Sequence, residues 1–143
     1  MHLLSSKIKF DEQTRGFGEN LLKIRGWRIH SFEYPVLDVE FTFPQRHGLR
    51  VRMICDNWDD DPPSVQLLSQ CGDRLVTVKR DPVGVINEGQ HPHTGYPFIC
   101  MRGSREYHTH SSHVTDHWSN YRGKSSYDLG GILSQIWRAW MKT

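Results

Sequence analysis

The chain has 143 residues, of which 24% are charged and 36% hydrophobic, and we predict a single soluble domain over residues 1–143. The formal net charge of +2 is too small to indicate a nucleic-acid partner. No apolar run approaches the ~20 residues of a membrane span, and residues 1–25 lack a signal-peptide pattern, so we expect no membrane partner.

The number and spacing of the cysteines indicate the cellular compartment. Cys55, Cys71 and Cys100 form an odd, sparse set without a C-x-x-C pair. Such a set is typical of a reducing cytoplasm rather than of a disulfide-bonded secreted protein. We therefore expect a cytoplasmic protein.

The first half of the chain predicts an α+β fold. Apolar residues at helical spacing predict one N-terminal helix over residues 3–25, which Gly26 ends. From Trp27 the period changes to two, and alternating residues predict strands over 27–30, 36–43 and 49–53, with a turn at 44–48. Short alternating strands with tight turns indicate an antiparallel meander with one solvated face.

The region after the third strand contains two turn signals. Asp59, Asp60 and Asp61 lack the spacing of a calcium loop, so we interpret them as a solvated turn. Pro62-Pro63 then favours an extended entry into a fourth strand over residues 65–68. Residues 69–90 predict a surface hairpin or loop with a short strand at 75–78.

The stretch from His91 to Cys100 reads HPHTGYPFIC and contains the main candidate for chemistry. Its two prolines and its glycine restrict the backbone, so Cys100 follows a stiff loop. A thiol presented in this way can act as a covalent nucleophile. The alternative is that Cys100 is a small core residue, as most free cysteines are.

The last segment predicts one long helix. Ser125-x-x-Asp128 can form a capping box at its start. Its apolar positions recur at i, i+3, i+4 and i+7, and they are Leu129, Ile132, Leu133, Ile136, Trp137 and Trp140.

The order of these features resembles the ubiquitin-conjugating (UBC) enzymes. That family has strands, a Pro-Pro turn, a His-Pro-Asn motif, an Ile-Cys-Leu motif, a Trp and then a helix. Here the two motifs read His-Pro-His at 91–93 and Ile-Cys-Met at 99–101, and the resemblance covers roughly residues 20–140. The chain looks most like divergent bacterial members from antiphage (Bil-type) operons, which also encode a ubiquitin-like protein and an activating enzyme.

The resemblance implies a fold and an activity. The fold is UBC-like: an N-terminal helix, a four-stranded antiparallel meander, an active-site loop and one long C-terminal helix, without the family's last two helices. The activity is that of a conjugating enzyme. An activating enzyme passes the C-terminus of a ubiquitin-like protein to Cys100 as a thioester, and an amine of a target protein, usually lysine, then attacks it. We expect no cofactor and no metal for this chemistry.

The resemblance also implies roles for two histidines. His93 stands where the family has the Asn that supplies or supports a donor to the carbonyl oxygen, and an imidazole N–H can also donate. His91 matches the motif histidine, whose ring nitrogens mainly hold the loop in place.

The histidine-rich segment 107–118 suggests a further role. His110, His113 or Asp116 could lie near Cys100 and deprotonate or orient the incoming amine. The sequence does not decide which of the three does so. Cys55 and Cys71 have no comparable setting, and we interpret both as structural.

Two other classes of function compete with this interpretation. His108-x-His110 followed by Asp116 is similar to the JAMM motif of metal hydrolases, and His108, His110 and His113 could bind zinc. Some proteins with the UBC-like fold are non-catalytic adaptors that only bind ubiquitin-like partners.

Overall fold

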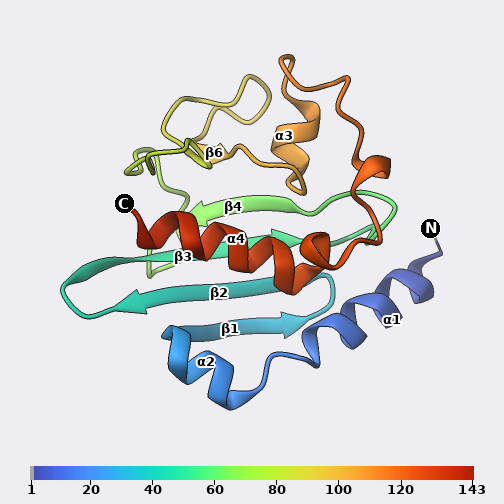
Figure 1. Cartoon of the computed structure of the whole chain (residues 1–143), viewed down its shortest axis with the longest axis horizontal. Helices are drawn as coiled ribbons and strands as arrows, with labels where there is room; N and C mark the ends of the chain where they lie inside the picture. The colour runs from blue at the N-terminus through green and yellow to red at the C-terminus, as the bar shows by residue number, and fades with distance from the viewer. Residues whose placement is uncertain (1) are drawn as a thin grey trace.

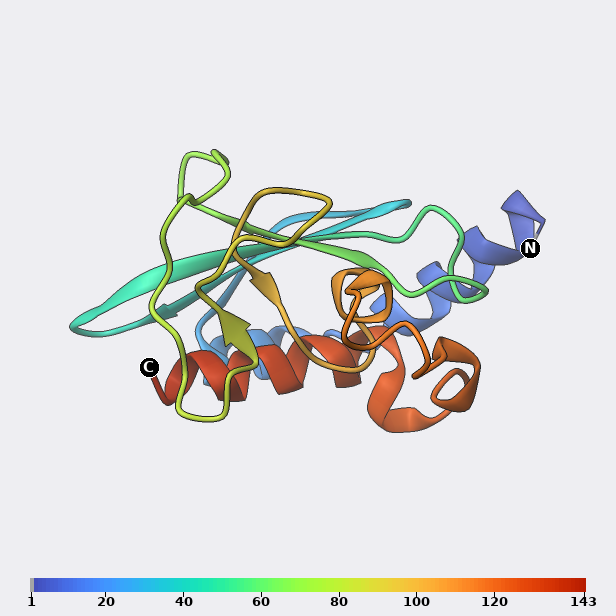
Figure 2. The same ribbon diagram turned by 90° about the horizontal axis from the view of Figure 1, so that it is seen from above.

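The computed structural model describes residues 2–143 and has a mixed α+β fold. Four antiparallel strands form one sheet in the order β1-β2-β3-β4, as predicted. The C-terminal helix α4 lies along one face of this sheet, and Figure 2 shows the sheet and α4 as two layers. A second, two-stranded sheet pairs β5 with β6 beside α3 (Figure 1).

The strands are β1 Trp27–Glu33, β2 Val36–Phe43, β3 Arg46–Ile54, β4 Ser64–Leu68, β5 Ile86–Asn87 and β6 Phe98–Ile99. The helices are α1 Leu3–Thr14, α2 Glu19–Arg25, α3 Arg105–Thr109 and α4 Leu129–Met141, with short 3-10 turns η1 Trp118–Asn120 and η2 Ser125–Tyr127. The turn predicted at 44–48 is tighter than expected, because β3 already begins at Arg46.

The prediction of one N-terminal helix was wrong, because the chain forms two helices there. Residues 15–18 separate α1 from α2 and include Gly16 and Gly18, which disfavour a helix interior. Phe17, between these glycines, stacks on Phe32 with 5.3 Å between ring centroids. The break therefore directs an aromatic side chain onto the sheet.

The inner face of the sheet and α4 share one core. Leu37, Val39 and Phe41 of β2 are fully buried. Their alternation with Asp38 and Glu40 is the period that predicted this strand. On the helix side, Trp140 packs against Phe41, with 5.6 Å between ring centroids. The remaining helix residues in the core are Leu129, Ile132, Leu133, Ile136 and Ala139.

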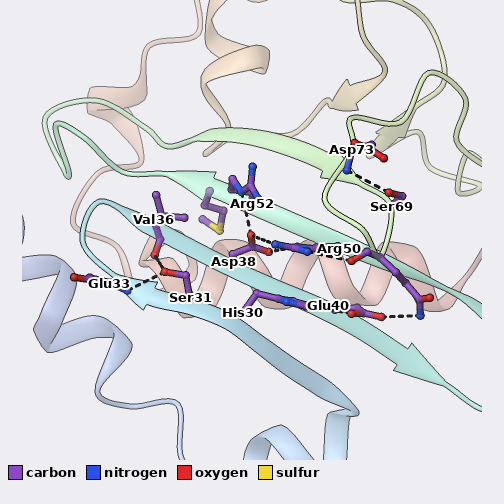
Figure 3. A network of polar contacts seen from close by, with 12 residues as sticks. His30, Ser31, Glu33, Val36, Asp38, Glu40, Arg50, Arg52, Ser69 and Asp73 are labelled. Carbon is purple, nitrogen blue, oxygen red and sulfur yellow. Dashed lines mark hydrogen bonds and ion pairs between the residues drawn. The ribbon is translucent and has the colours of Figure 1, made fainter.

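The outer face is less solvated than the alternation predicted. Asp38 and Glu40 are only 2% exposed although they point away from α4. Figure 3 shows why: long side chains of neighbouring strands cover them. Asp38 accepts hydrogen bonds from Arg50 and Arg52, and Glu40 bonds the His30 ring at 2.9 Å. Hydrogen bonds from neighbouring side chains, which for Asp38 come from two arginines, account for the burial of these carboxylates.

Two loop predictions were also wrong. Asp59 is not in a solvated turn, because it is 7% exposed and forms ion pairs with Lys9 at 2.8 Å and Arg122 at 3.0 Å. The strand predicted at 75–78 is absent from the described chain. Leu75 makes one backbone hydrogen bond to Leu67 of β4, and the chain then leaves the sheet edge for the level of α4 (Figure 2).

Within residues 2–143, no helix has the length and apolarity that a membrane crossing requires.

The start of α4 differs from the predicted capping box. Asp128, not Ser125, is the N-cap, and its Oδ1 accepts the backbone N–H of Gly131 at 2.6 Å. Ser125 belongs to the preceding 3-10 turn. The N-terminus of α4 is also held by Gln13 of α1, which accepts the N–H of Leu129 at 2.9 Å.

We predict that Asp128→Ala lowers the free energy of unfolding by about 1 kcal/mol, because it removes the acceptor at the helix N-terminus. Asp128→Asn keeps an acceptor oxygen and should remain close to wild type. Urea denaturation of the three proteins measures both differences, and equal stability of Asp128→Ala and wild type would contradict this cap assignment.

Candidate functional site

The two-stranded sheet sets the position of Cys100. Ile86 pairs with Ile99, and Asn87 pairs with Phe98. Cys100 directly follows β6, and its backbone N–H donates to the carbonyl of Val85 at 2.7 Å. The residue is half-buried, so the thiol lies at the surface end of a strand pair rather than inside the core.

His91 ties the loop before β6 to helix α3. The His91 side chain is 1% exposed. Its Nδ1 accepts the backbone N–H of His93 at 3.1 Å, and its Nε2 bonds the backbone carbonyl of Glu106 at 2.8 Å. Because a carbonyl only accepts, Nε2 carries the hydrogen and the ring is the neutral Nε2–H tautomer. Both ring nitrogens therefore hold the loop in place.

Helix α3 is itself anchored to the sheet. Ser104 is its N-cap, accepting from the N–H of Tyr107 at 3.1 Å and donating its hydroxyl to the carbonyl of Ile99 at 2.7 Å. The buried carboxylate of Glu106 accepts from the Ser64 hydroxyl at 2.7 Å and from the N–H of Val65 at 2.6 Å. Helix α3 is therefore fixed to β4 at one side and to β6 at the other.

The closest ionisable neighbour of the Cys100 thiol in the hydrogen-bond network is His113. The distance from Sγ to His113 Nε2 is 3.9 Å, within reach of a sulfur hydrogen bond. The His113 ring stacks on Tyr107, with 4.2 Å between centroids and 14° between planes. Tyr107 is buried in α3. The ring of His113 is thus supported from one side while its Nε2 faces the sulfur.

Asn87 is a second polar neighbour of the thiol. Its Oδ1 accepts the N–H of Gly89 at 2.8 Å, which fixes the orientation of the amide. Burial raises the pKa of the Cys100 thiol, and a hydrogen bond from the Asn87 side chain opposes this rise. Asn87 pairs with Phe98, two residues before Cys100, so the register puts the Asn87 side chain on the same face of the strand pair as the thiol.

The carboxylate of Asp116, a predicted candidate for the base, is occupied by three donors. Its carboxylate accepts hydroxyl hydrogens from Tyr107 and Tyr121, each at 2.6 Å, and the Arg102 guanidinium at 3.0 Å. These three donors, Tyr107 foremost, hold the pKa of Asp116 well below its usual range. A carboxylate held in this form is a poor proton acceptor. Asp116 instead orients Tyr107, on which His113 stacks.

His108 has both ring nitrogens in hydrogen bonds. Its Nε2 accepts the N–H of Gly103 at 3.1 Å, and its Nδ1 bonds the carbonyl of Asp116 at 2.7 Å. Neither nitrogen is available to a metal without breaking one of these bonds. No group of three or more metal-ligating side chains occurs within residues 2–143.

The other predicted residues lie around this centre. His110 stacks on Phe98, with 5.7 Å between ring centroids, and lies 5.9 Å from the His113 ring. His93 is exposed, and in the described chain its ring has no hydrogen bond to Cys100. Cys55 is buried, which raises its thiol pKa, whereas Cys71 is exposed.

Sequence reasoning missed Asn87 and Tyr107. Asn87 pairs with Phe98, and Phe98 stands two residues before Cys100. This pairing could not be predicted, because each of the two strands has only two residues and shows no alternation in the sequence. The signal for Tyr107 was the Ser104-x-x-Tyr107 spacing of a capped turn.

Comparison with known proteins gives one match. A family model described as Y4jH-like, for the Y4jH family, matches residues 82–143. No curated protein matches the chain. The matched segment is less than half of the chain, and it contains Asn87, Cys100, His113 and Asp116. Because the family description names no activity, the functional argument depends on the geometry of these residues.

The environment of His108 predicts how stability depends on pH. Burial lowers the pKa of His108 in the folded protein, whereas an imidazole in an unfolded chain has a pKa of about 6.5. The folded state therefore binds fewer protons, and the His108 contribution to stability is present above pH ~6.5 and is lost as the pH falls below it.

We expect the unfolding free energy of wild type to fall between pH 7.5 and pH 5.5 more than that of His108→Gln, which cannot titrate. Chemical denaturation of both proteins at the two pH values tests this difference. An identical fall in both proteins would show that His108 does not titrate differently on folding.

Proposed function

We propose that this chain is a ubiquitin-like-protein conjugating enzyme with a UBC-like fold, in which Cys100 carries the modifier as a thioester. The observation that supports this most directly is the half-exposed Cys100 thiol with His113 Nε2 at 3.9 Å. A nucleophile and a base within hydrogen-bond reach are the arrangement that covalent catalysis requires.

The loading step begins with the thiol. Burial keeps Cys100 protonated at rest, so a base must take its proton when the acyl group arrives. His113 Nε2 accepts that proton, and the thiolate attacks the carbonyl carbon of the activated modifier. Negative charge develops on the carbonyl oxygen, the tetrahedral intermediate collapses, and the thiol of the activating enzyme leaves with a proton from His113.

The transfer step reuses the same base. A lysine amine of the target attacks the thioester carbonyl, His113 accepts a proton from the amine, and the Cys100 thiolate leaves. The products are an amide bond and a free thiol, which regains its proton from His113. Such positioned proton transfer typically contributes about 10²–10⁴-fold to a rate.

The remaining residues have supporting roles in this proposal. His91 holds the loop, and Asp116 acts through Tyr107 on the orientation of His113. His110, whose ring lies 5.9 Å from that of His113, is the candidate in this proposal for a contact with the incoming amine. The donor role of His93 remains a prediction, and Asn87 is a second candidate for that role.

The order of elements supports the UBC-like part of the proposal. A four-stranded meander is followed by the His-Pro loop, the cysteine after a short strand, and a helix across the sheet. The partners would be a ubiquitin-like protein, its activating enzyme and a target protein, in the cytoplasm. A bacterial antiphage setting follows from the resemblance alone.

Reconstitution with the ubiquitin-like protein and activating enzyme of the same operon tests the proposal. Wild type should form an adduct that a reducing agent cleaves, and Cys100→Ser should form a thiol-resistant oxyester more slowly. Cys100→Ala should form none. Denaturing gels with and without reductant distinguish these products.

Cys71→Ser is the matched control, because Cys71 is exposed and lies outside the site. This variant should load like wild type. An adduct on Cys100→Ala, or its loss in Cys71→Ser, would assign the carrier role to another residue and refute the proposal.

A further inference from the structure

We propose that Cys100, His113 and Asn87 form a self-contained acyl-hydrolase site, which cleaves small activated esters and thioesters without any partner protein. This activity uses the thiol of the proposed conjugating enzyme but does not depend on a modifier or on an activating enzyme. Water is the acceptor.

Three groups from separate segments meet at the sulfur. Cys100 follows β6, Asn87 ends β5, and His113 lies in the loop after α3. The sulfur lies 3.9 Å from His113 Nε2, and the pairing of Asn87 with Phe98 puts the Asn87 side chain on the same face as the thiol. The arrangement thus combines a nucleophile, a proton acceptor and a neutral donor, which are the parts that acyl transfer needs.

Each of the two polar neighbours is held in its orientation. The Asn87 amide is fixed by the bond from the N–H of Gly89 at 2.8 Å. The His113 ring lies flat on Tyr107, whose hydroxyl donates to Asp116 at 2.6 Å. Groups that are oriented before the substrate arrives do not have to reorganise during the reaction, which is the basis of electrostatic catalysis.

The first half-reaction forms an acyl-enzyme. His113 Nε2 takes the Cys100 proton, and the sulfur attacks the ester carbonyl carbon. The amide NH₂ of Asn87, on the same face as the thiol, donates to the oxygen that becomes negatively charged. The C–O bond to the leaving group breaks, and the alcohol departs with the proton that His113 holds.

The second half-reaction returns the free enzyme. A water molecule gives a proton to His113 Nε2 and attacks the thioester carbonyl. The C–S bond breaks, the sulfur regains the proton from His113, and the carboxylic acid is released. No oxidant, metal or second substrate other than water is required.

The same geometry explains why the substrate class is small and activated. Cys100 is half-buried, while neighbouring residues of the loop and of the segment after α3 are exposed, including His93, Ser111 and Ser112. The half-buried sulfur is therefore accessible to water and to a small acyl group. Activated esters need little help from an acid at the leaving group, so they match a site in which one imidazole acts as the base.

Hydrolysis of p-nitrophenyl acetate by the full chain tests the proposal. Wild type should release p-nitrophenol over many turnovers, and Cys100→Ala should fall to the rate of the uncatalysed reaction. Asn87→Ala should be slower in both half-reactions, by about 10²-fold if it stabilises the oxyanion as single donors do in other enzymes.

His113→Gln provides the most specific result. The good leaving group lets the thiol acquire the acetyl group without much help, but deacylation still needs a base for water. This variant should therefore show one slow round of p-nitrophenol release and then stop, with an acetyl group retained on the protein in mass spectrometry.

His117→Gln and Cys71→Ser are the controls, since both side chains are exposed. Both should turn over like wild type, and circular dichroism of each variant identifies a folding defect. Wild-type turnover by His113→Gln, or by Cys100→Ala, would overturn the proposal, as would a wild-type protein that is acetylated once and never regenerated. Because the assay contains no ubiquitin-like protein, a lack of esterase activity would not contradict the thioester-carrier proposal. A failure of the reconstitution with the ubiquitin-like protein would likewise not contradict the hydrolase proposal.

Discussion

The geometry of the candidate site depends on the way in which Glu106 joins three segments. Its carboxylate accepts hydrogen bonds from Ser64 and Val65 at the start of β4, and its backbone carbonyl accepts from the His91 ring. All of these groups except Ser64 are buried. Leaving a buried donor without its acceptor costs about 1–3 kcal/mol of free energy, so separation of the three segments is unfavourable. The loop before Cys100 and the helix that supports His113 are therefore both positioned relative to the main sheet.

The carboxylate of Asp116 is connected to the site through Tyr107. The carboxylate is satisfied by two tyrosine hydroxyls and by Arg102, so it neither accepts a proton nor pairs directly with His113. One of those tyrosines, Tyr107, forms the surface on which the His113 ring lies. Asp116 thereby contributes orientation rather than basicity. An acidic residue near a histidine need not act as its hydrogen-bond partner, and here the Tyr107 ring connects the two.

The sequence predicted the strands and the helix in which one face is buried and the other is not. The strands around Val39 and Val51 and the helix from Leu129 were readable because apolar side chains recur with period 2 or 3.6. Cys100 was found because prolines and a glycine surround it. Burial of Asp38 was not readable, since it depends on arginines of a neighbouring strand. Asn87 was missed for a similar reason: strands of two residues leave no periodicity, and only their pairing brings the amide to the sulfur.

Desolvation connects the two activities that we propose for Cys100. Burial of the sulfur favours the neutral thiol over the thiolate, and the Asn87 hydrogen bond offsets part of this effect. In the proposed mechanism the thiolate forms when His113 takes the proton, which links nucleophilicity to the presence of a carbonyl group to attack. The same imidazole then serves whichever acceptor reaches the thioester, an amine or water. Because the base does not distinguish between them, the proposal implies that the lifetime of a thioester on Cys100 depends on how far the exposed segments that contain His93 and Ser111 are covered. A bound modifier that covers these segments would exclude water and direct the acyl group to the amine.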